Sequence, residues 1–377
     1  MAMVEFVGQS ARDSDNVSSN TSRLLNCYRE PVVPGGATGH VLKSVLGQEA
    51  FADLSTVLLR DMQVVDGMIY AAAGGALYEV SSAGVSTNRG AVPDDENTSI
   101  AGNFGSVAVV SGGTYSLWDG TALTTPTGGA FTNFGSVCYV GGYSVFTQLN
   151  GRQFQWSALA DASTLDALNF QTADSRDDKN IRGVALNGRL LVFKERSIET
   201  WYITGQAGAN VFGRVAGGTI DTGLKDFNLL AEFPGGIFFV GDDGIVYLMS
   251  GALQPVSTPP VETAVSQSNP THCYLYEDEG HKFLCIRFSD RPTWCYDLST
   301  GEWHERAEGR LHGPWSVTTT VELGGNWYAG NINAVINRLA RTNEDLGDEL
   351  RNRAVSFEVY NDGQRFKVAE VEILGRV

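Results

Sequence analysis

The sequence predicts an all-β protein: a six- or seven-bladed β-propeller with an extended N-terminal arm and a C-terminal strand segment that forms a second small β domain. Glycine is abundant, with 44 of 377 residues, and aromatic residues make up 10%. Runs with helical periodicity are rare, while short segments of alternating apolar residues are common. A turn-and-strand pattern also recurs along most of the chain, as propeller blades do.

Seven segments share this pattern of a glycine-containing turn, an apolar strand, a second turn and another strand that ends near an aromatic residue. Their turn glycines lie 30 to 53 residues apart. The segments are 64–84, 104–123, 134–159, 187–205, 234–253, 279–306 and 323–340. A four-stranded blade of this length buries both faces only between two neighbours. Apolar residues at both odd and even strand positions, as in 237–240, fit that arrangement, because they place apolar side chains on both faces of the sheet. Six blades result if 104–123 and 134–159 share one sheet.

The division of the chain follows from these repeats. Residues 45–340 are expected to form the propeller, and residues 1–44 an arm whose polar, Gly/Pro-rich stretch 8–40 pairs with edge strands of another subunit or of its own second domain. Residues 341–377 are expected to form a β-hairpin or platform, whose pattern breaks off in mid-sheet at Val377. Short helices are predicted within 160–180, capped by Ser163 or Thr164, and after Pro259-Pro260.

Charge and cysteine content exclude several classes of protein. The formal net charge of −16 argues against a broad nucleic-acid-binding surface and against docking on an anionic membrane. No apolar stretch is long enough to span a membrane, and the first residues lack a signal-peptide pattern. Five cysteines spread over the chain predict reduced, buried thiols, with Cys285 and Cys295 placed to face each other across a hairpin.

No catalytic, cofactor-binding or metal-binding residues are predicted, because no motif with the required spacing occurs. Tryptophan falls about once per repeat, which favours packing between blades over stacking on sugars. The packing candidates are Trp156, Trp201, Trp294 and Trp303. Three acids of one loop, Asp174, Asp177 and Asp178, are candidates for a channel wall or a subunit interface, although a solvated loop explains them as well.

Four blocks of the chain resemble one known family. They are 22–32, 166–224, 238–265 and 276–306, and the last includes the distinctive stretch TWCYDLSTGEWHER. The order and content of these blocks resemble the tail hub proteins of short-tailed bacteriophages, also called nozzle or packaged-DNA stabilisation proteins.

The resemblance implies a structural, non-enzymatic virion protein. It implies a ring, commonly a hexamer, below the portal and its adaptor, which extends the DNA channel and helps to retain packaged DNA. Tail needle, fibre or spike proteins attach to such a ring. DNA passes through during ejection without specific binding, and the ring assembles in the host cytoplasm. An acidic channel wall would keep DNA from adhering.

Two other classes remain as alternatives. A carbohydrate-binding or glycan-hydrolysing propeller would need convergent carboxylates and exposed tryptophan on one propeller face. A generic scaffold of the WD or kelch type would be a free monomer that binds host partners.

Overall fold

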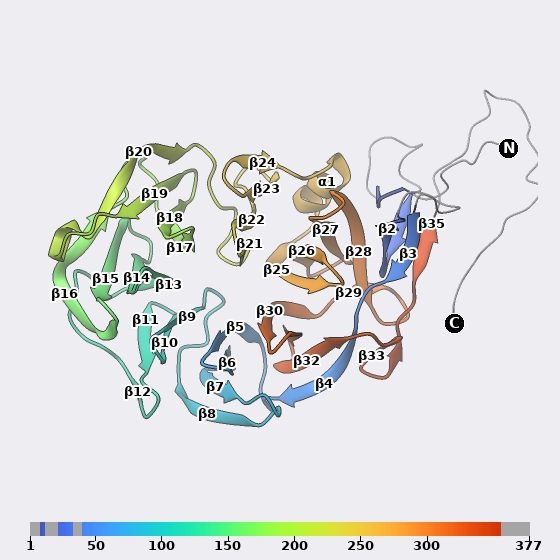
Figure 1. The fold of residues 1–377 in the computed structure, drawn as a ribbon, viewed down its shortest axis with the longest axis horizontal. Helices are drawn as coiled ribbons and strands as arrows, with labels where there is room; N and C mark the ends of the chain where they lie inside the picture. The colour runs from blue at the N-terminus through green and yellow to red at the C-terminus, as the bar shows by residue number, and fades with distance from the viewer. Residues whose placement is uncertain (1–7, 12–21, 33–39, 356–377) are drawn as a thin grey trace, which may run out of the picture.

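The computed structural model describes residues 8–11, 22–32 and 40–355. Within them, seven sheets contain a four-stranded antiparallel unit, and the units stand side by side around one axis (Figure 1). The all-β propeller expected from the sequence is therefore confirmed, and its described part has seven blades. Segments 104–123 and 134–159 lie in separate sheets.

The first four blades follow the chain without interruption. Blade 1 is β5 (Leu59–Val65), β6 (Met68–Ala73), β7 (Ala76–Val80) and β8 (Ser86–Ala91). Blade 2 is β9 (Ser99–Asn103), β10 (Ser106–Ser111), β11 (Thr114–Trp118) and β12 (Leu123–Thr124). Blade 3 is β13 (Phe134–Val140), β14 (Tyr143–Gln148), β15 (Gln153–Ala158) and β16 (Asp161–Thr172). Blade 4 is β17 (Asn180–Leu186), β18 (Arg189–Lys194), β19 (Ile198–Ile203) and β20 (Phe212–Ile220), with the short 3-10 helix η1 (Gly208–Asn210) before β20.

The last three blades include the ring closure. Blade 5 is β21 (Leu230–Phe233), β22 (Gly236–Val240), β23 (Val246–Met249) and β24 (Leu253–Pro255), followed by helix α1 (Pro259–Gln267). Blade 6 is β25 (Pro270–Asp278), β26 (His281–Phe288), β27 (Thr293–Asp297) and β28 (Glu302–Glu308). Blade 7 is β30 (Val317–Leu323), β31 (Asn326–Asn331), β32 (Val335–Ala340) and β4 (Gly47–Asp53).

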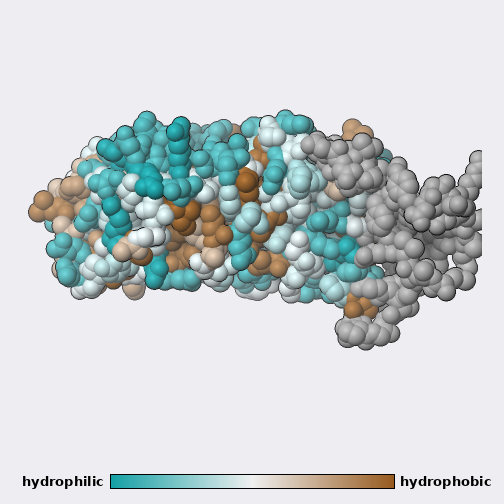
Figure 2. All heavy atoms as spheres, turned by 90° about the horizontal axis from the view of Figure 1, so that it is seen from above, coloured by the Kyte–Doolittle hydropathy of each residue, from teal (hydrophilic) through white to brown (hydrophobic). Residues whose placement is uncertain are grey.

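The hydrophobic core is divided among the seven interfaces between neighbouring blades. Seven buried clusters each draw mainly on two adjoining blades, and together they close the circle from blade 1 back to blade 1. Because every blade is covered on both faces, its strands carry apolar residues at odd and even positions alike. Figure 2 shows the propeller edge-on as a flat disc, with apolar patches on the visible rim among hydrophilic residues.

Ring closure joins distant parts of the chain. Strand β4, which precedes blade 1, pairs antiparallel with β32, the third strand of blade 7, from Gly47 opposite Ala340 to Asp53 opposite Val335. Separation of the first and last blades therefore requires that this ladder break.

Strands from both ends of the chain lie outside blades 6 and 7. They are β1 (Arg23–Leu25), β2 (Cys27–Pro31), β3 (His40–Ser44), β33 (Glu344–Asp345), β34 (Asp348–Glu349) and β35 (Arg353–Val355). Strands β2 and β3 form a two-stranded sheet of their own, and β29 (Gly313–Pro314), from the segment between the two blades, pairs with β28. Strand β1 runs parallel to β28 and antiparallel to β35, and β33 runs parallel to β4. Of the described part of the arm, β1 thus pairs with strands of its own chain, the outer strand of blade 6 and β35. The predicted hairpin around Asn361 lies outside the described residues, so a second C-terminal domain stays a prediction.

One predicted helix is wrong. Residues 161–172 form β16, which pairs with β15 through an irregular register. The Asp161 carboxylate accepts hydrogen bonds from the Ser163 and Thr164 hydroxyls at 2.6 and 2.7 Å, so the side chains that looked like helix caps stabilise a turn at the start of the strand. Pairing with an available edge strand outweighs the weak local helix signal.

The second predicted helix is confirmed as α1. It begins at Pro259, where proline costs no hydrogen bond, and buries Val261, Ala264 and Val265 in the cluster between blades 5 and 6. Neither α1 nor η1, the helices of the described residues, has the length and apolar character that crossing a membrane requires.

The predicted cysteine pair is also confirmed. Cys285 and Cys295 are register partners on β26 and β27, with their Sγ atoms 3.3 Å apart. All five cysteines are free and buried.

Candidate functional site

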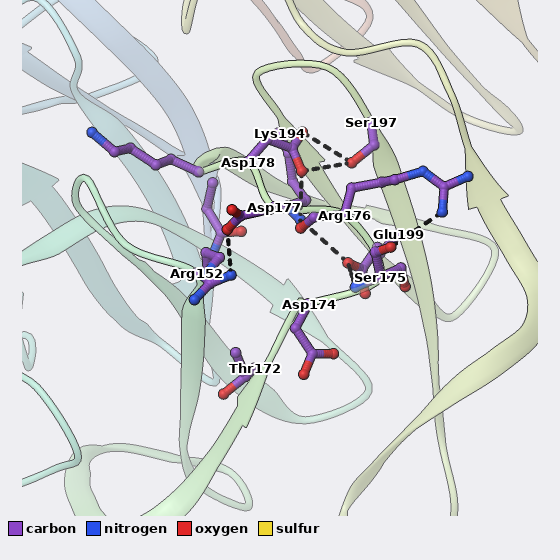
Figure 3. Close-up of polar contacts among 12 residues, drawn as sticks. Arg152, Thr172, Asp174, Ser175, Arg176, Asp177, Asp178, Lys194, Ser197 and Glu199 are labelled. Carbon is purple, nitrogen blue, oxygen red and sulfur yellow. Dashed lines mark hydrogen bonds and ion pairs between the residues drawn. The ribbon is translucent and has the colours of Figure 1, made fainter.

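The acidic loop 174–178 connects the outer strand of blade 3 to the inner strand of blade 4. It folds over a buried lysine, Lys194, at the end of β18 (Figure 3). Lys194 is fully buried, and its Nζ lies 2.7 Å from the Asp178 carboxylate and 3.4 Å from that of Glu199. It also donates to the Arg176 carbonyl at 2.8 Å. Burial opposes the charge on Asp178, but Lys194 and the Arg196 N–H outweigh it and lower the pKa of that carboxyl. This cluster fixes the loop on blade 4.

The exposed acids of the loop are paired as well. Asp177, whose side chain is 95% exposed, lies 2.7 Å from Arg152, and Asp174 pairs with Arg214. The Arg214 guanidinium lowers the pKa of Asp174. Since Asp178 is buried, only Asp174 and Asp177 present carboxylates to a possible neighbour.

The buried and exposed acids of the loop should differ in their contribution to stability. We expect Asp178→Ala to lower the free energy of unfolding by about 2–3 kcal/mol, because Lys194 would stay buried with Glu199 as its remaining carboxylate. Asp177→Ala is the matched control and should cost less than about 1 kcal/mol, as exposed ion pairs do. Urea unfolding of both variants measures the difference. Equal losses would contradict the structural role of the cluster.

The four tryptophans singled out by the sequence lie between blades. Trp156 and Trp201 belong to the cluster between blades 3 and 4, and Trp294 and Trp303 to the one between blades 5 and 6. All four are at most 3% exposed. The Trp303 indole N–H donates to the Val256 carbonyl at 2.9 Å, which ties β28 to the segment before α1.

A histidine network, which sequence reasoning missed, fastens the arm to blade 6. His281 Nε2 lies 2.7 Å from Glu30 on β2, and its Nδ1 lies 2.7 Å from Asp297 on β27. Glu30 also pairs with Lys43 of β3 at 2.9 Å. The Ser299 hydroxyl contacts the same Nδ1 atom as Asp297, so these residues lack the relay of a serine hydrolase, in which acid and nucleophile use different ring nitrogens.

The charge on His281 makes the contribution of this network to the stability of the protein depend on pH. Burial opposes that charge, but hydrogen bonds with Asp297 and Glu30 outweigh burial and raise the pKa of His281 above its ordinary 6.5. A raised folded-state pKa adds stability that is complete below pH 6.5 and is lost as the pH rises through the folded value. We expect the stability difference between wild type and His281→Gln to shrink as the pH rises from about 6 to about 9. Urea unfolding across this range checks it, and a difference that grows with pH would contradict it.

A cavity of about 720 Å³ follows the propeller axis, and all seven blades line it. The lining includes, in blade order, Asp61, Ile100, Tyr139, Arg182, Glu232, His272 and Thr320. The loop acids Asp174, Asp177 and Asp178 are not part of it. Sequence reasoning missed these axial residues, because each belongs to a different repeat and only ring closure brings them together. Among residues 8–11, 22–32 and 40–355, no group of three His, Cys, Asp or Glu is placed to hold a metal ion.

Fold and site together define a propeller whose charged clusters fasten loops and terminal strands to the blades. A family model described as "Bacteriophage P22 Gp10, beta-propeller" matches residues 8–343. The chain belongs to this family and is thus a structural protein of a bacteriophage virion. The family expected from the sequence is confirmed. A search of curated proteins gives no match.

Solved structures resemble the chain in fold alone. A catalytically inactive virginiamycin B lyase from Staphylococcus aureus has a TM-score of 0.56 at 9% identity, over 79% of this chain and 99% of the lyase. The extracellular domain of a putative hybrid two-component system from B. thetaiotaomicron has a TM-score of 0.54 at 9% identity, over 78% of this chain and 39% of that one. The WD40 propeller of Doa1 has a TM-score of 0.52 at 10% identity, over 78% and 98%. Such low identities show the propeller fold and carry no function.

Proposed function

We propose that the protein is the tail hub or nozzle subunit of a short-tailed phage. It assembles into a ring, a hexamer, below the portal and adaptor, extends the DNA channel, and carries tail needle, fibre or spike proteins. The observation that supports this most strongly is the family match over residues 8–343, which spans all seven blades and reaches into the arm. The ring forms in the host cytoplasm and becomes part of the virion tail.

The terminal strands are suited to contacts between subunits. Strands β1 and β35 and the antiparallel pair β2 and β3 lie outside the propeller beside blade 6 (Figure 1). Within the described residues β35 is the outermost strand of its sheet, and a strand in that position is where another chain can pair. Asp174 and Asp177, on blades 3 and 4, are the loop's candidates for a contact or for the wall of the shared channel.

The role in DNA passage follows from charge. Six copies at −16 each carry −96, and such an excess cannot gather at subunit contacts, where like charges oppose association. It belongs on the channel wall and outer rim, where it repels phosphate and lets the duplex slide.

Electron microscopy of the purified full chain in negative stain tests the ring, and native mass spectrometry counts the subunits. Sixfold rings with a central hole are the expected result. A monomer at every concentration would overturn the proposal. Tight, salt-dependent binding of duplex DNA at physiological ionic strength would overturn the passive channel.

A further inference from the structure

The axial cavity is bridged at one end. The Asn228 amide, from the loop between blades 4 and 5, donates to the Glu96 carbonyl, from the loop between blades 1 and 2, at 3.0 Å. These loops belong to different arcs of the ring, so their contact crosses the axis. The inner strand of every blade starts at this end and finishes at its first hairpin turn, which places Phe104 and Tyr139 toward the other end. The cavity is therefore a cup with a bridged floor.

Charged side chains from separate blades face one another in the cup. Asp61 of blade 1 accepts the Ile100 N–H at 2.9 Å, and burial raises the pKa of its carboxyl to about 6 against the opposing charge of Arg182. Arg182 of blade 4 lies 4.0 Å from Glu232 of blade 5, whose pKa burial also raises. Both carboxylates thus lie within the electrostatic influence of the same guanidinium.

The charges of the cup partly cancel, which narrows the class of ligand. Arg60 and Arg182 face the carboxylates of Asp61, Asp66 and Glu232, and Arg60 also pairs with Asp94 at 3.1 Å. His272 adds no charge, because burial together with the nearby Arg287 and Arg60 lowers its pKa to about 3. Its Nδ1 atom is buried and has no hydrogen-bond partner. An anion gains little here, whereas a neutral ligand rich in hydroxyl groups can use donors and acceptors on several sides.

An aromatic residue at the rim lacks a structural explanation. Phe104 is 72% exposed and has a φ of +47°, a left-handed conformation that disfavours a bulky side chain. The same turn position in blades 1 and 4 is held by Asp66 and Asn187, residue types that tolerate this conformation. Phe104 meets Tyr139 edge-on with ring centroids 6.3 Å apart. A residue in a strained conformation that exposes an aromatic ring at the mouth of a polar cavity points to a binding site.

We propose that this cup binds a short neutral saccharide, with the ring of Phe104 against a sugar face and with Asp61, Arg182 and Glu232 bonded to its hydroxyl groups. The volume of about 720 Å³ lies within the usual range of ligand sites, roughly 300–1,000 Å³. The buried tryptophans play no part. The activity is binding without hydrolysis, and it is independent of the ring proposed above.

Saturation-transfer NMR on the full chain tests the proposal. The probes are neutral di- and trisaccharides built from glucose, galactose, mannose, rhamnose and N-acetylglucosamine. We expect transfer to at least one probe, with affinity then measured by titration calorimetry. Phe104→Asn keeps a residue suited to the turn and should weaken binding about fivefold or more, as should Glu232→Gln.

Tyr202→Ala is the matched control, since Tyr202 is 44% exposed on β19, outside the cup, and should leave affinity unchanged. Absence of transfer to every probe would overturn the proposal, as would equal binding by wild type and Phe104→Asn. Negative-stain images of the same variants report the ring separately, so a failure of one proposal is distinguishable from a failure of the other.

Discussion

We expect Trp303→Ala to lower the free energy of unfolding by about 3–5 kcal/mol, the usual cost when a fully buried large aromatic side chain is truncated. Trp303 is 1% exposed and packs between blades 5 and 6. Its ring centroid lies 5.1 Å from that of Tyr296 and 6.2 Å from that of Trp294. The variant also leaves the Val256 carbonyl without its indole donor. Urea unfolding followed by circular dichroism measures the loss.

A nearby exposed residue provides the control for this variant. Leu311, in the loop after β28, is 96% exposed, so Leu311→Ala should change stability by no more than about 0.5 kcal/mol. A loss at Trp303 as small as that at Leu311 would show that the interface between blades 5 and 6 does not depend on this side chain.

The parts of the fold that could be predicted are those encoded locally. Each blade is a contiguous run of strands and tight turns, as with Asn187-Gly188, whose positive φ values suit a two-residue hairpin. The pairing of Cys285 with Cys295 follows from one hairpin, and α1 from its proline start. The helix predicted within 160–180 was wrong because the spacing of Ser, Thr and Asp there fits a helix cap and a strand turn equally well. Only pairing with the edge of β15 decides between the two.

The clusters that hold the loops and line the axis could not be predicted. Lys194 is charged, and sequence reasoning places such a residue on the surface, yet it is fully buried because the 174–178 loop folds over it. Asp61, Arg182 and Glu232 lie in three different blades, so their convergence depends on ring closure. Of the loop acids the sequence singled out, Asp178 belongs to such a cluster, a role that spacing alone does not reveal.

A buried ion pair ties the C-terminal extension, residues 341–355, to the propeller. Arg306 on β28 is fully buried and holds both oxygens of Asp345 on β33 at 2.7 and 2.8 Å. Its guanidinium also lies 4.6 Å from the ring of Trp315. The pair joins blade 6 to the strand that covers β4, the closing strand of the ring.

We expect Asp345→Ala to cost about 3–5 kcal/mol, because Arg306 would be left buried without its carboxylate. Arg306→Met removes the charge and keeps much of the side-chain volume. The double variant should therefore lose less stability than the sum of the two single losses, since no unpaired buried charge remains. Urea unfolding of all four proteins completes the cycle. Strictly additive losses would mean that Arg306 and Asp345 stabilise the extension separately, and that the ion pair does not fasten β33 to the ring.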